Sequence, residues 1–198
     1  MEIKQINAVD PKIVDAIVSI HQNVLTDSFL NNFGIEFLKI IYTNLIQSSE
    51  IICLIAYEGN GIEGFALATK DYSFFLKSAL SKNKLRAVYS MSTHVILRPA
   101  VVWKLMLSLP EILFSKDIPH AELQFIAITP KSQGKGLGSA LMNKLKEKYR
   151  AEGLNEFYIG TKADNLLSNK FYQKIGCVKK YSRKYFGDKM NYYVYPIL

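Results

Sequence analysis

The sequence predicts an α/β (α+β) fold in one domain over residues 1–198. Three segments support this class. Residues 121–150 read as a strand, a glycine-rich turn and a helix, while residues 51–70 and 177–195 each read as two strands joined by a tight turn. Helical patterns separate these strands, as expected of a sheet covered by helices. A chain of 198 residues is large enough for one well-buried core and small for two.

The first part of the chain predicts a strand, two helices and two strands, in that order. Residues 2–8 form a short β-rich run, and Asp10 with a following proline is typical of a helix start. Apolar residues then recur on one helical face at Ile13, Ile17, Ile20 and Val24, and on a second at Leu38, Ile41, Tyr42 and Leu45. Strands at 51–57 and 62–70 follow, around a turn at 58–61.

About fifty residues, 71–120, pattern mostly as helix before the next strand. We therefore expect a helical insertion between the third and fourth strands. Arg86, Arg98 and Lys104 interrupt its apolar residues, so no window approaches the roughly 20 apolar residues of a membrane span. The insertion could pack as additional core, form one wall of a substrate pocket or lie on a membrane, and the sequence leaves these roles open.

The segment that follows predicts an anion-binding loop. Apolar residues from Leu123 to Ile128 indicate a buried strand, which breaks at Thr129 and Pro130. A glycine-rich turn then leads into a helix whose apolar face is Leu137, Leu141, Leu145 and Tyr149. The first turn of a helix has unpaired backbone N–H groups and positive potential, and glycines allow a diphosphate to approach the backbone.

Two common phosphate motifs are excluded at this loop. A Walker loop requires Ser or Thr after Gly-Lys, but Lys135 is followed by Gly136. A dinucleotide fingerprint requires a third glycine that would fall at Ser139 or Leu141. The pattern that fits is Gln/Arg-x-x-Gly-x-Gly/Ala, carried by Gln133, Gly136 and Gly138.

A second motif runs from Asn165 to Cys177, with Phe171 and Tyr172 adjacent. Its helical pattern places Leu167, Phe171 and Ile175 on one face. Asp164 or Asn165 can cap the start of this helix, and Gly176 can end it.

These two motifs together resemble the GNAT superfamily of acyl-CoA N-acyltransferases, specifically from Glu122 to about Gly176. Ser168 and Cys177 depart from the alanine and phenylalanine usual in the family. The resemblance implies a GNAT fold: a mixed central sheet of about seven strands, splayed between the fourth and fifth, with helices on both faces. It also implies acetyl-CoA as cofactor and direct transfer of the acetyl group to a primary amine.

The resemblance also implies the cofactor site. The splay would leave backbone groups near Ile126 and Ile128 free for the pantetheine arm. The diphosphate would bind the loop made of Gln133, Gly134, Lys135, Gly136, Leu137, Gly138 and Ser139. Asn165 corresponds to an asparagine that hydrogen-bonds the cofactor, although a plain helix cap remains an alternative.

Glu122 and Tyr172 are the candidate catalytic residues. Strand alternation predicts that Glu122, Gln124, Ile126 and Ile128 share one face, and several family members place the general base at the position of Glu122. An apolar setting would raise the pKa of Glu122, which would make it a better general base. The alternative is a solvent-facing glutamate at a strand end. Tyr172 matches the tyrosine that protonates the leaving thiolate in many members, or it packs on the cofactor without acid function.

The acceptor is less defined. The formal charge of +8 suits an anionic cofactor or substrate, a membrane surface or nucleic acid, without choosing among them. Tyrosines among the C-terminal basic residues suit single-stranded nucleic acid or a half-buried strand, and we expect no specific nucleic acid partner. The segment from His21 to Leu38 is similar to members that act in cell-surface sugar biosynthesis. An amino sugar or nucleotide-linked amino sugar is therefore one expected acceptor; a protein or peptide amine, another small amine, or a catalytically silent acyl-CoA-binding module are the alternatives.

Other features bear on the cellular setting. The N-terminus lacks the apolar core of a signal peptide, which favours a cytoplasmic protein. Cys53 and Cys177 are expected to be buried free thiols, and the three histidines are scattered, so we predict no metal site. Peripheral membrane contact and oligomeric state stay open.

Overall fold

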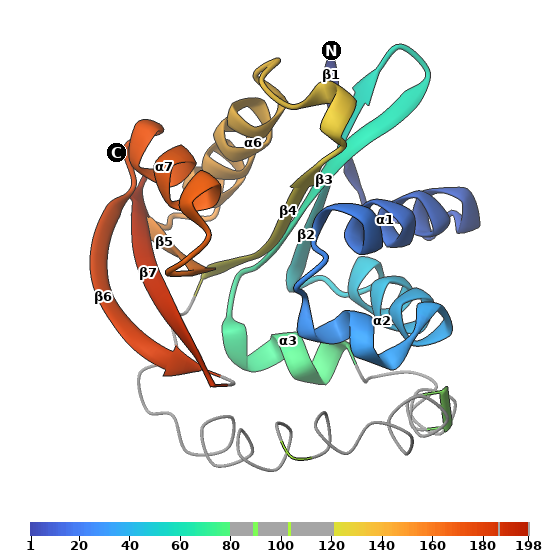
Figure 1. Cartoon of the computed structure of the whole chain (residues 1–198). Helices are drawn as coiled ribbons and strands as arrows, with labels where there is room; N and C mark the ends of the chain where they lie inside the picture. The colour runs from blue at the N-terminus through green and yellow to red at the C-terminus, as the bar shows by residue number, and fades with distance from the viewer. Residues whose placement is uncertain (80–88, 91–102, 104–120, 186, 198) are drawn as a thin grey trace.

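The computed structural model describes residues 1–79, 89, 90, 103, 121–185 and 187–197. In these residues a seven-stranded sheet has the order β1-β2-β3-β4-β5-β7-β6, with helices on both of its faces (Figure 1). This arrangement confirms the predicted fold class.

The first elements follow the predicted order. They are β1 (Glu2–Ile6), α1 (Pro11–Val24), the 3-10 helix η1 (Phe29–Phe33), α2 (Ile35–Ile46), β2 (Ile51–Glu58) and β3 (Gly61–Thr69). The Asp10 side chain accepts a hydrogen bond from the Lys12 backbone N–H, so it caps α1 as expected. The sequence pattern did not predict η1, which buries Phe33.

The remaining elements are α3 (Tyr72–Ala79), β4 (Glu122–Ile128), η2 (Pro130–Ser132), α6 (Leu137–Ala151), β5 (Glu156–Lys162), α7 (Leu166–Lys174), β6 (Val178–Tyr185) and β7 (Asp188–Pro196). Helix α3 confirms that the inserted segment begins as a helix. Most of the insertion, including Arg86, Arg98 and Lys104, lies outside the described residues.

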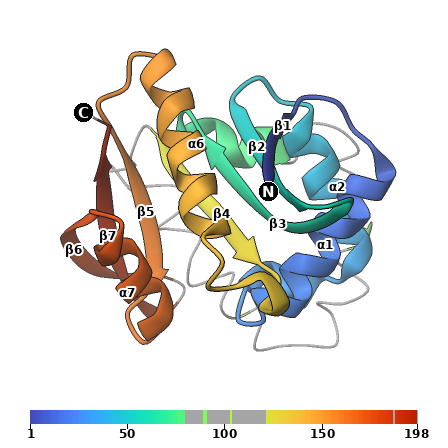
Figure 2. The same cartoon turned by 90° about the horizontal axis from the view of Figure 1, so that it is seen from above.

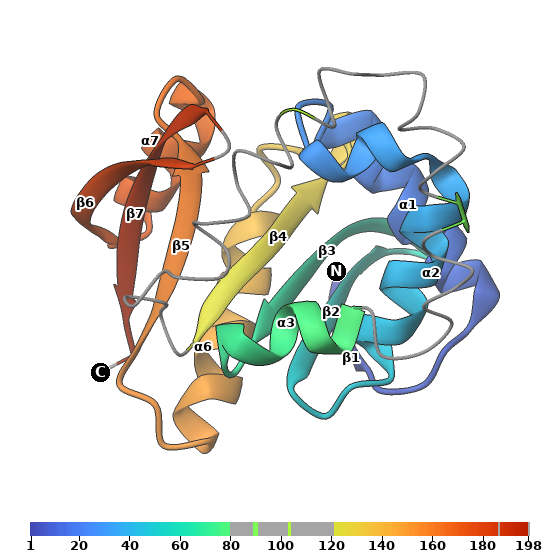
Figure 3. The ribbon, with the colours of Figure 1, turned by 90° about the horizontal axis from the view of Figure 1, so that it is seen from below.

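The sheet opens between β4 and β5. From β1 to β4, each strand pairs antiparallel with the next strand along the chain, whereas β4 and β5 run parallel. Within the described chain, β4 and β5 pair only at Glu122 with Tyr158 and at Leu123 with Ile159. Beyond this point the two strands diverge (Figure 2, Figure 3). The splay predicted between the fourth and fifth strands is confirmed.

Two apolar cores cover the two faces of the sheet. One packs α1 and α2 against β2 and β3, and the other packs α6 and α7 against the opposite face (Figure 1). The predicted apolar face of α6 is fully confirmed, since Leu137, Leu141, Leu145 and Tyr149 are all buried. Cys53 and Cys177 are buried free thiols, as expected.

The predicted apolar face of α7 is confirmed at Phe171 and Ile175, which pack against the core on the α6 side, but is wrong at Leu167. Leu167 is 82% exposed, and the helix buries Asn169 and Tyr172 instead. The physical reason is a buried polar hub. The Asn169 amide donates to the Lys162 carbonyl at 2.8 Å, and its oxygen accepts from Tyr193 at 2.8 Å. A polar residue on the docking face is stable because these hydrogen bonds satisfy it.

Among the described residues, no helix has the length and apolar character that a membrane crossing requires.

Candidate active site

Strands β4 and β5 pair at Glu122 and Leu123 and then diverge, which leaves a wedge between them that is closed at Glu122 and open at Ile128. Among the residues that the structure describes, the backbone of β4 is not paired with β5 along this wedge. The Thr129 N–H donates to the Glu63 carbonyl at 2.8 Å, and the register pairs Ile128 with Gly64. Because backbone groups alternate in direction along an antiparallel pair, those of Ile126 and Ile128 point away from β3 and into the wedge. The Gln133 side-chain amide donates to the Ile128 carbonyl at 3.0 Å. The two predicted strand positions and Gln133 therefore meet at the open end of the wedge.

A β-bulge in β4 changes which of its residues share a face, compared with the alternation predicted from the sequence. The β3–β4 register shifts at Gln124, between the pairs Leu123–Ala68 and Phe125–Leu67. Leu123 consequently belongs to the same core as Ile126 and Ile128, on the α6 side. Glu122, which precedes Leu123, faces the opposite side of the sheet. The expectation that Glu122 and Gln124 share a face with Ile126 and Ile128 is wrong, because one extra residue reverses the alternation.

The loop before α6 has the backbone of an anion receptor. Gly134 and Gly136 have φ values of 77° and 87°, which side chains other than glycine rarely adopt. Gly136 is the N-cap of α6 and has no side chain with which to cap it. The N–H groups of Leu137, Gly138 and Ser139 lie in the first turn, where no carbonyl of a preceding turn can accept them. The positive end of the helix therefore faces outward from this loop.

Two of the predicted loop residues contribute differently from the others. The Leu137 side chain is buried in the core, so only its backbone N–H is available to a ligand. A Cβ built on Gly138 would lie 3.2 Å from the Phe171 ring of α7. Gly138 is thus required for the contact between α6 and α7, and not only for ligand approach.

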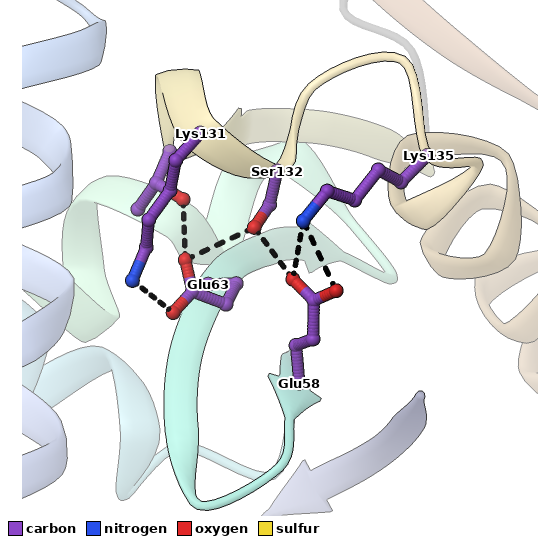
Figure 4. Close-up of polar contacts among 6 residues, drawn as sticks. Glu58, Glu63, Lys131, Ser132 and Lys135 are labelled. Carbon is purple, nitrogen blue, oxygen red and sulfur yellow. Dashed lines mark hydrogen bonds and ion pairs between the residues drawn. The ribbon is translucent and has the colours of Figure 1, made fainter.

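Carboxylates of the β2–β3 hairpin hold the loop through a network of polar contacts (Figure 4). Lys135 Nζ pairs with Glu58 at 3.0 Å, and Lys131 Nζ pairs with Glu63 at 2.7 Å. The Ser132 hydroxyl lies between the two carboxylates, 2.8 Å from Glu58 and 3.2 Å from Glu63. These pairs lower the pKa of both glutamates, which therefore stay ionised. Neither glutamate was singled out from the sequence.

Glu122 lies at the closed end of the wedge and is buried. Its Oε1 would be 3.6 Å from a Cβ built on Gly160 of β5. Burial raises the pKa of Glu122 to about 8, and the Gln124 side chain and the charge of Arg183 limit the rise. The alternative of a solvent-facing glutamate is excluded, and a carboxyl that titrates near neutral pH is suited to proton transfer.

Aromatic and basic residues of the C-terminal hairpin complete the surroundings of Glu122. The Arg183 guanidinium lies over the Tyr192 ring at 5.2 Å and over the Tyr185 ring at 5.7 Å. Tyr192 also stacks on Tyr181, with ring centroids 4.9 Å apart. The sequence showed basic residues and tyrosines here, but only the pairing of β5, β7 and β6 brings Arg183 and Tyr192 to Glu122.

Tyr172 and Asn165 lie on α7, across the sheet from Glu122. Tyr172 is buried, and its ring lies 5.9 Å from that of Tyr193. Burial raises the pKa of its hydroxyl, which keeps it protonated. The Asn165 oxygen accepts from the Ser168 N–H at 3.0 Å, so this residue is the helix cap, and its amide remains the group that could meet a ligand. In the described part of the chain, no cluster of His, Cys, Asp and Glu could hold a metal ion.

Comparisons with known proteins agree with this geometry. A model of the acetyltransferase (GNAT) family matches residues 20–177. A search among curated sequences found no match. Solved structures with the same fold include the ribosomal-protein-S18-alanine N-acetyltransferase of Escherichia coli, at 14% identity, TM-score 0.60, and coverage of 99% of this chain and 93% of that one.

Two further structures are similar over nearly the whole chain. An N-acetyltransferase of Staphylococcus aureus shares 15% identity at TM-score 0.59, with 100% of both chains covered. An aminoglycoside 6'-N-acetyltransferase complexed with coenzyme A shares 12% identity at TM-score 0.62, covering 100% of this chain and 98% of that one. These likenesses show the fold, and the family match covers most of the sequence. The chain therefore belongs to the acetyltransferase (GNAT) family.

Proposed function

We propose that the protein is an acetyl-CoA-dependent N-acetyltransferase that moves the acetyl group directly to a primary amine. The observation that carries this proposal is the wedge of β4 and β5. Its open end adjoins the N-terminus of α6, and its closed end holds Glu122. A cofactor held by its phosphates at Gly136 would extend its arm along the backbone of Ile126 and Ile128 on the side that does not pair with β3. That path, six residues at about 3.3 Å each, is on the order of 20 Å and ends at Glu122.

The proposed chemistry uses the two faces of the sheet. Glu122 faces one side and Tyr172 lies in the core of the other side. Glu122 would accept the proton that the acceptor amine loses as its nitrogen forms the new bond to the acetyl carbon. Tyr172 would donate a proton to the thiolate that leaves from that carbon. Acid and base on opposite sides of the wedge fit a transfer in which the amine attacks the acetyl carbon from the side of Glu122 and the thiolate leaves toward Tyr172.

The residues present fit coenzyme A. The α6 N-terminus and the positive-φ glycines suit a diphosphate, and the Gln133 amide fixes the strand end beside it. When bound, acetyl-CoA supplies the activated acetyl group. The similar aminoglycoside acetyltransferase is a complex with coenzyme A, which supports the same cofactor here.

For the acceptor, the surroundings of Glu122 favour a ring-bearing amine such as an amino sugar. Tyr192 and the charge of Arg183 lie beside the carboxyl, and the partly exposed Tyr181 ring, stacked on Tyr192, offers an aromatic surface next to them. His21 does not belong to this surface. It is fully buried and bonded to Tyr42, and burial lowers its pKa to about 4. A sugar acceptor is therefore favoured by the residues beside Glu122 and not by His21.

A thiol-release assay with acetyl-CoA tests this proposal. The panel contains free and nucleotide-linked amino sugars, aminoglycosides, polyamines, amino acids and peptides with free N-termini, and mass spectrometry identifies each product. We expect amine-dependent release with addition of one acetyl group to a sugar amine. Preference for a peptide would overturn the sugar assignment, and absence of release with every amine would overturn the enzyme assignment in favour of a silent binding module.

A further inference from the structure

The β2–β3 hairpin carries a buried carboxylate that holds the phosphate loop. The Glu63 side chain is 6% exposed. It accepts from the Thr129 hydroxyl at 2.6 Å, and Lys131 Nζ lies 2.7 Å from its other oxygen. The Glu63 carbonyl also accepts from the Thr129 N–H. Burying a carboxylate is costly unless donors surround it. Here the donors come from the loop, so hairpin and loop stabilise each other.

A second carboxylate, Glu58, occupies the exposed side of the same network. Both of its oxygens lie within 3.1 Å of Lys135 Nζ, and its side chain is 45% exposed. The buried Ser132 hydroxyl is within hydrogen-bond distance of Glu58 and Glu63, as Figure 4 shows. A hydroxyl has one hydrogen to donate, so Ser132 can serve one carboxylate at a time.

This arrangement is unexpected beside an anion receptor. Lys135 immediately precedes Gly136, the N-cap of α6, where a cation would attract phosphate. Its ammonium group is instead turned to Glu58 and neutralised by it. Glu58 thus adds negative charge near the α6 N-terminus that would receive the diphosphate. It also forms an ion pair with a cation that would otherwise attract the phosphates.

We propose that Glu63 anchors the loop in its anion-receiving conformation, and that Glu58 competes with the cofactor's phosphates for Lys135. The inference rests on the proposed coenzyme A site. When coenzyme A binds, Lys135 Nζ exchanges the Glu58 carboxylate for a phosphate oxygen. The contacts of Glu63 with Thr129 and Lys131 keep the loop on the hairpin meanwhile. Glu58 is then a positioning residue that lowers affinity, and its loss strengthens binding.

Calorimetric titration with coenzyme A tests both parts, at low and at high salt. Glu58→Gln should tighten binding by roughly two- to fivefold at low salt, the factor that an exposed ion pair can supply. The gain should shrink at high salt, since salt screens exposed charges. Glu63→Gln should weaken binding by about tenfold, which corresponds to one charge-assisted hydrogen bond.

Glu152→Gln is a matched control. Glu152 pairs with Lys70 at 2.8 Å, has the same 45% side-chain exposure as Glu58, and is the C-cap of the same helix, α6. The substitution removes the same charge at the far end of α6, and coenzyme A affinity should not change. If Glu63→Gln does not fold, Thr129→Val removes one hydrogen bond to the same carboxylate and should weaken binding by a smaller factor.

A double substitution isolates the competition. In a Lys135→Met background, Glu58→Gln should lose most of its gain, because there is no ammonium left to release. Weaker or unchanged binding by the single variant Glu58→Gln would overturn the inference, as would a full gain in the Lys135→Met background. A wild-type protein without affinity for coenzyme A would instead overturn the proposed cofactor site itself, so the two failures are distinguishable.

Discussion

The Glu122 carboxyl group lies against Gly160, with Oε1 3.6 Å from the position that a Cβ at residue 160 would occupy. The same Cβ would lie 3.3 Å from the Tyr192 ring. Glu122 and Tyr192 therefore share space that the missing side chain leaves open. Side-chain crowding explains the glycine at this position of β5.

Gly160→Ala should preserve the fold and impair the reaction. The added methyl group would lie 3.3 Å from the Tyr192 ring, which must move by a few tenths of an ångström beside Glu122. We expect kcat to fall by roughly tenfold, because small misplacements of a catalytic group are costly, while KM for acetyl-CoA stays unchanged. Steady-state kinetics check this, with thermal unfolding as the control for folding. A folded Gly160→Val protein with wild-type kcat would contradict the role given to this contact.

Arg183→Met should move the pH dependence of the reaction to higher pH. Gln124 of β4, Arg183 of β6 and Tyr192 of β7 interact with Glu122 on its own side of the sheet, and Tyr149 of α6 interacts with it electrostatically through the sheet. Arg183 supplies the positive charge among them, and this charge lowers the pKa of Glu122 against the effect of burial. Without it the inflection of kcat/KM should move to higher pH. Arg183→Lys should keep the wild-type inflection; a pH profile that Arg183→Met leaves in place would show that the charge does not act on the base.

Gly136→Val should weaken coenzyme A binding in addition to lowering the stability of the fold. Gly136 has φ of 87° at the N-terminus of α6, and Gly153 has φ of 78° just beyond its C-terminus. A Cβ at either residue would meet no atom within 4 Å, so both substitutions strain the backbone alike. We expect each to cost about 1 kcal/mol or more of stability, but only Gly136→Val to lower affinity, by at least tenfold. Equal affinities of the two folded variants in calorimetry would contradict the diphosphate site.

The order of the elements and the positions of the loop could be predicted from the sequence because both depend on local patterns. The α6 face, the Asp10 cap and the glycines of the loop follow from spacing alone. The face of Glu122 could not be predicted, because the bulge at Gln124 adds one residue that no periodicity reveals. The roles of Arg183, Tyr192 and Glu58 also depend on strand pairing, which brings distant segments together. Leu167 was assigned to the wrong face because Asn169, a polar residue, docks α7 through hydrogen bonds.

Tyr172→Phe should slow the reaction and leave the fold intact. The ring contacts with Phe171 and Tyr193 do not involve the hydroxyl. Losing the proton donor should lower kcat by about a hundredfold, with KM for acetyl-CoA nearly unchanged. Tyr193→Phe is the matched control, since it also removes a buried hydroxyl, one that donates to Asn169 at 2.8 Å. That variant should lose stability and keep its rate; a rate loss only in Tyr193→Phe would reverse the assignment.

The stability of the wild-type protein should depend on pH because the pKa of Glu122 is raised in the folded state. Its pKa is raised in the folded protein to about 8, so the folded state holds this proton up to a higher pH than the unfolded state does. The contribution to stability is therefore complete below the ordinary pKa of a glutamate and is lost as the pH rises from there to about 8. Chemical unfolding at several pH values should show a decline over this window that Glu122→Gln removes. Parallel curves for the two proteins would contradict a raised pKa.

The pH–rate profile of acetyl transfer by wild-type protein and by Glu122→Gln tests whether Glu122 is the general base. The base must be ionised to accept the proton of the amine, so wild-type kcat/KM should rise with pH and level off above about pH 8, where Glu122 has lost its proton. Glu122→Gln should be slower by about a hundredfold above that pH, and the difference should narrow at lower pH, where wild-type Glu122 is protonated. We expect the inflection near pH 8 to be lost in the variant. An unchanged rate and an unchanged inflection in Glu122→Gln would contradict this role of Glu122.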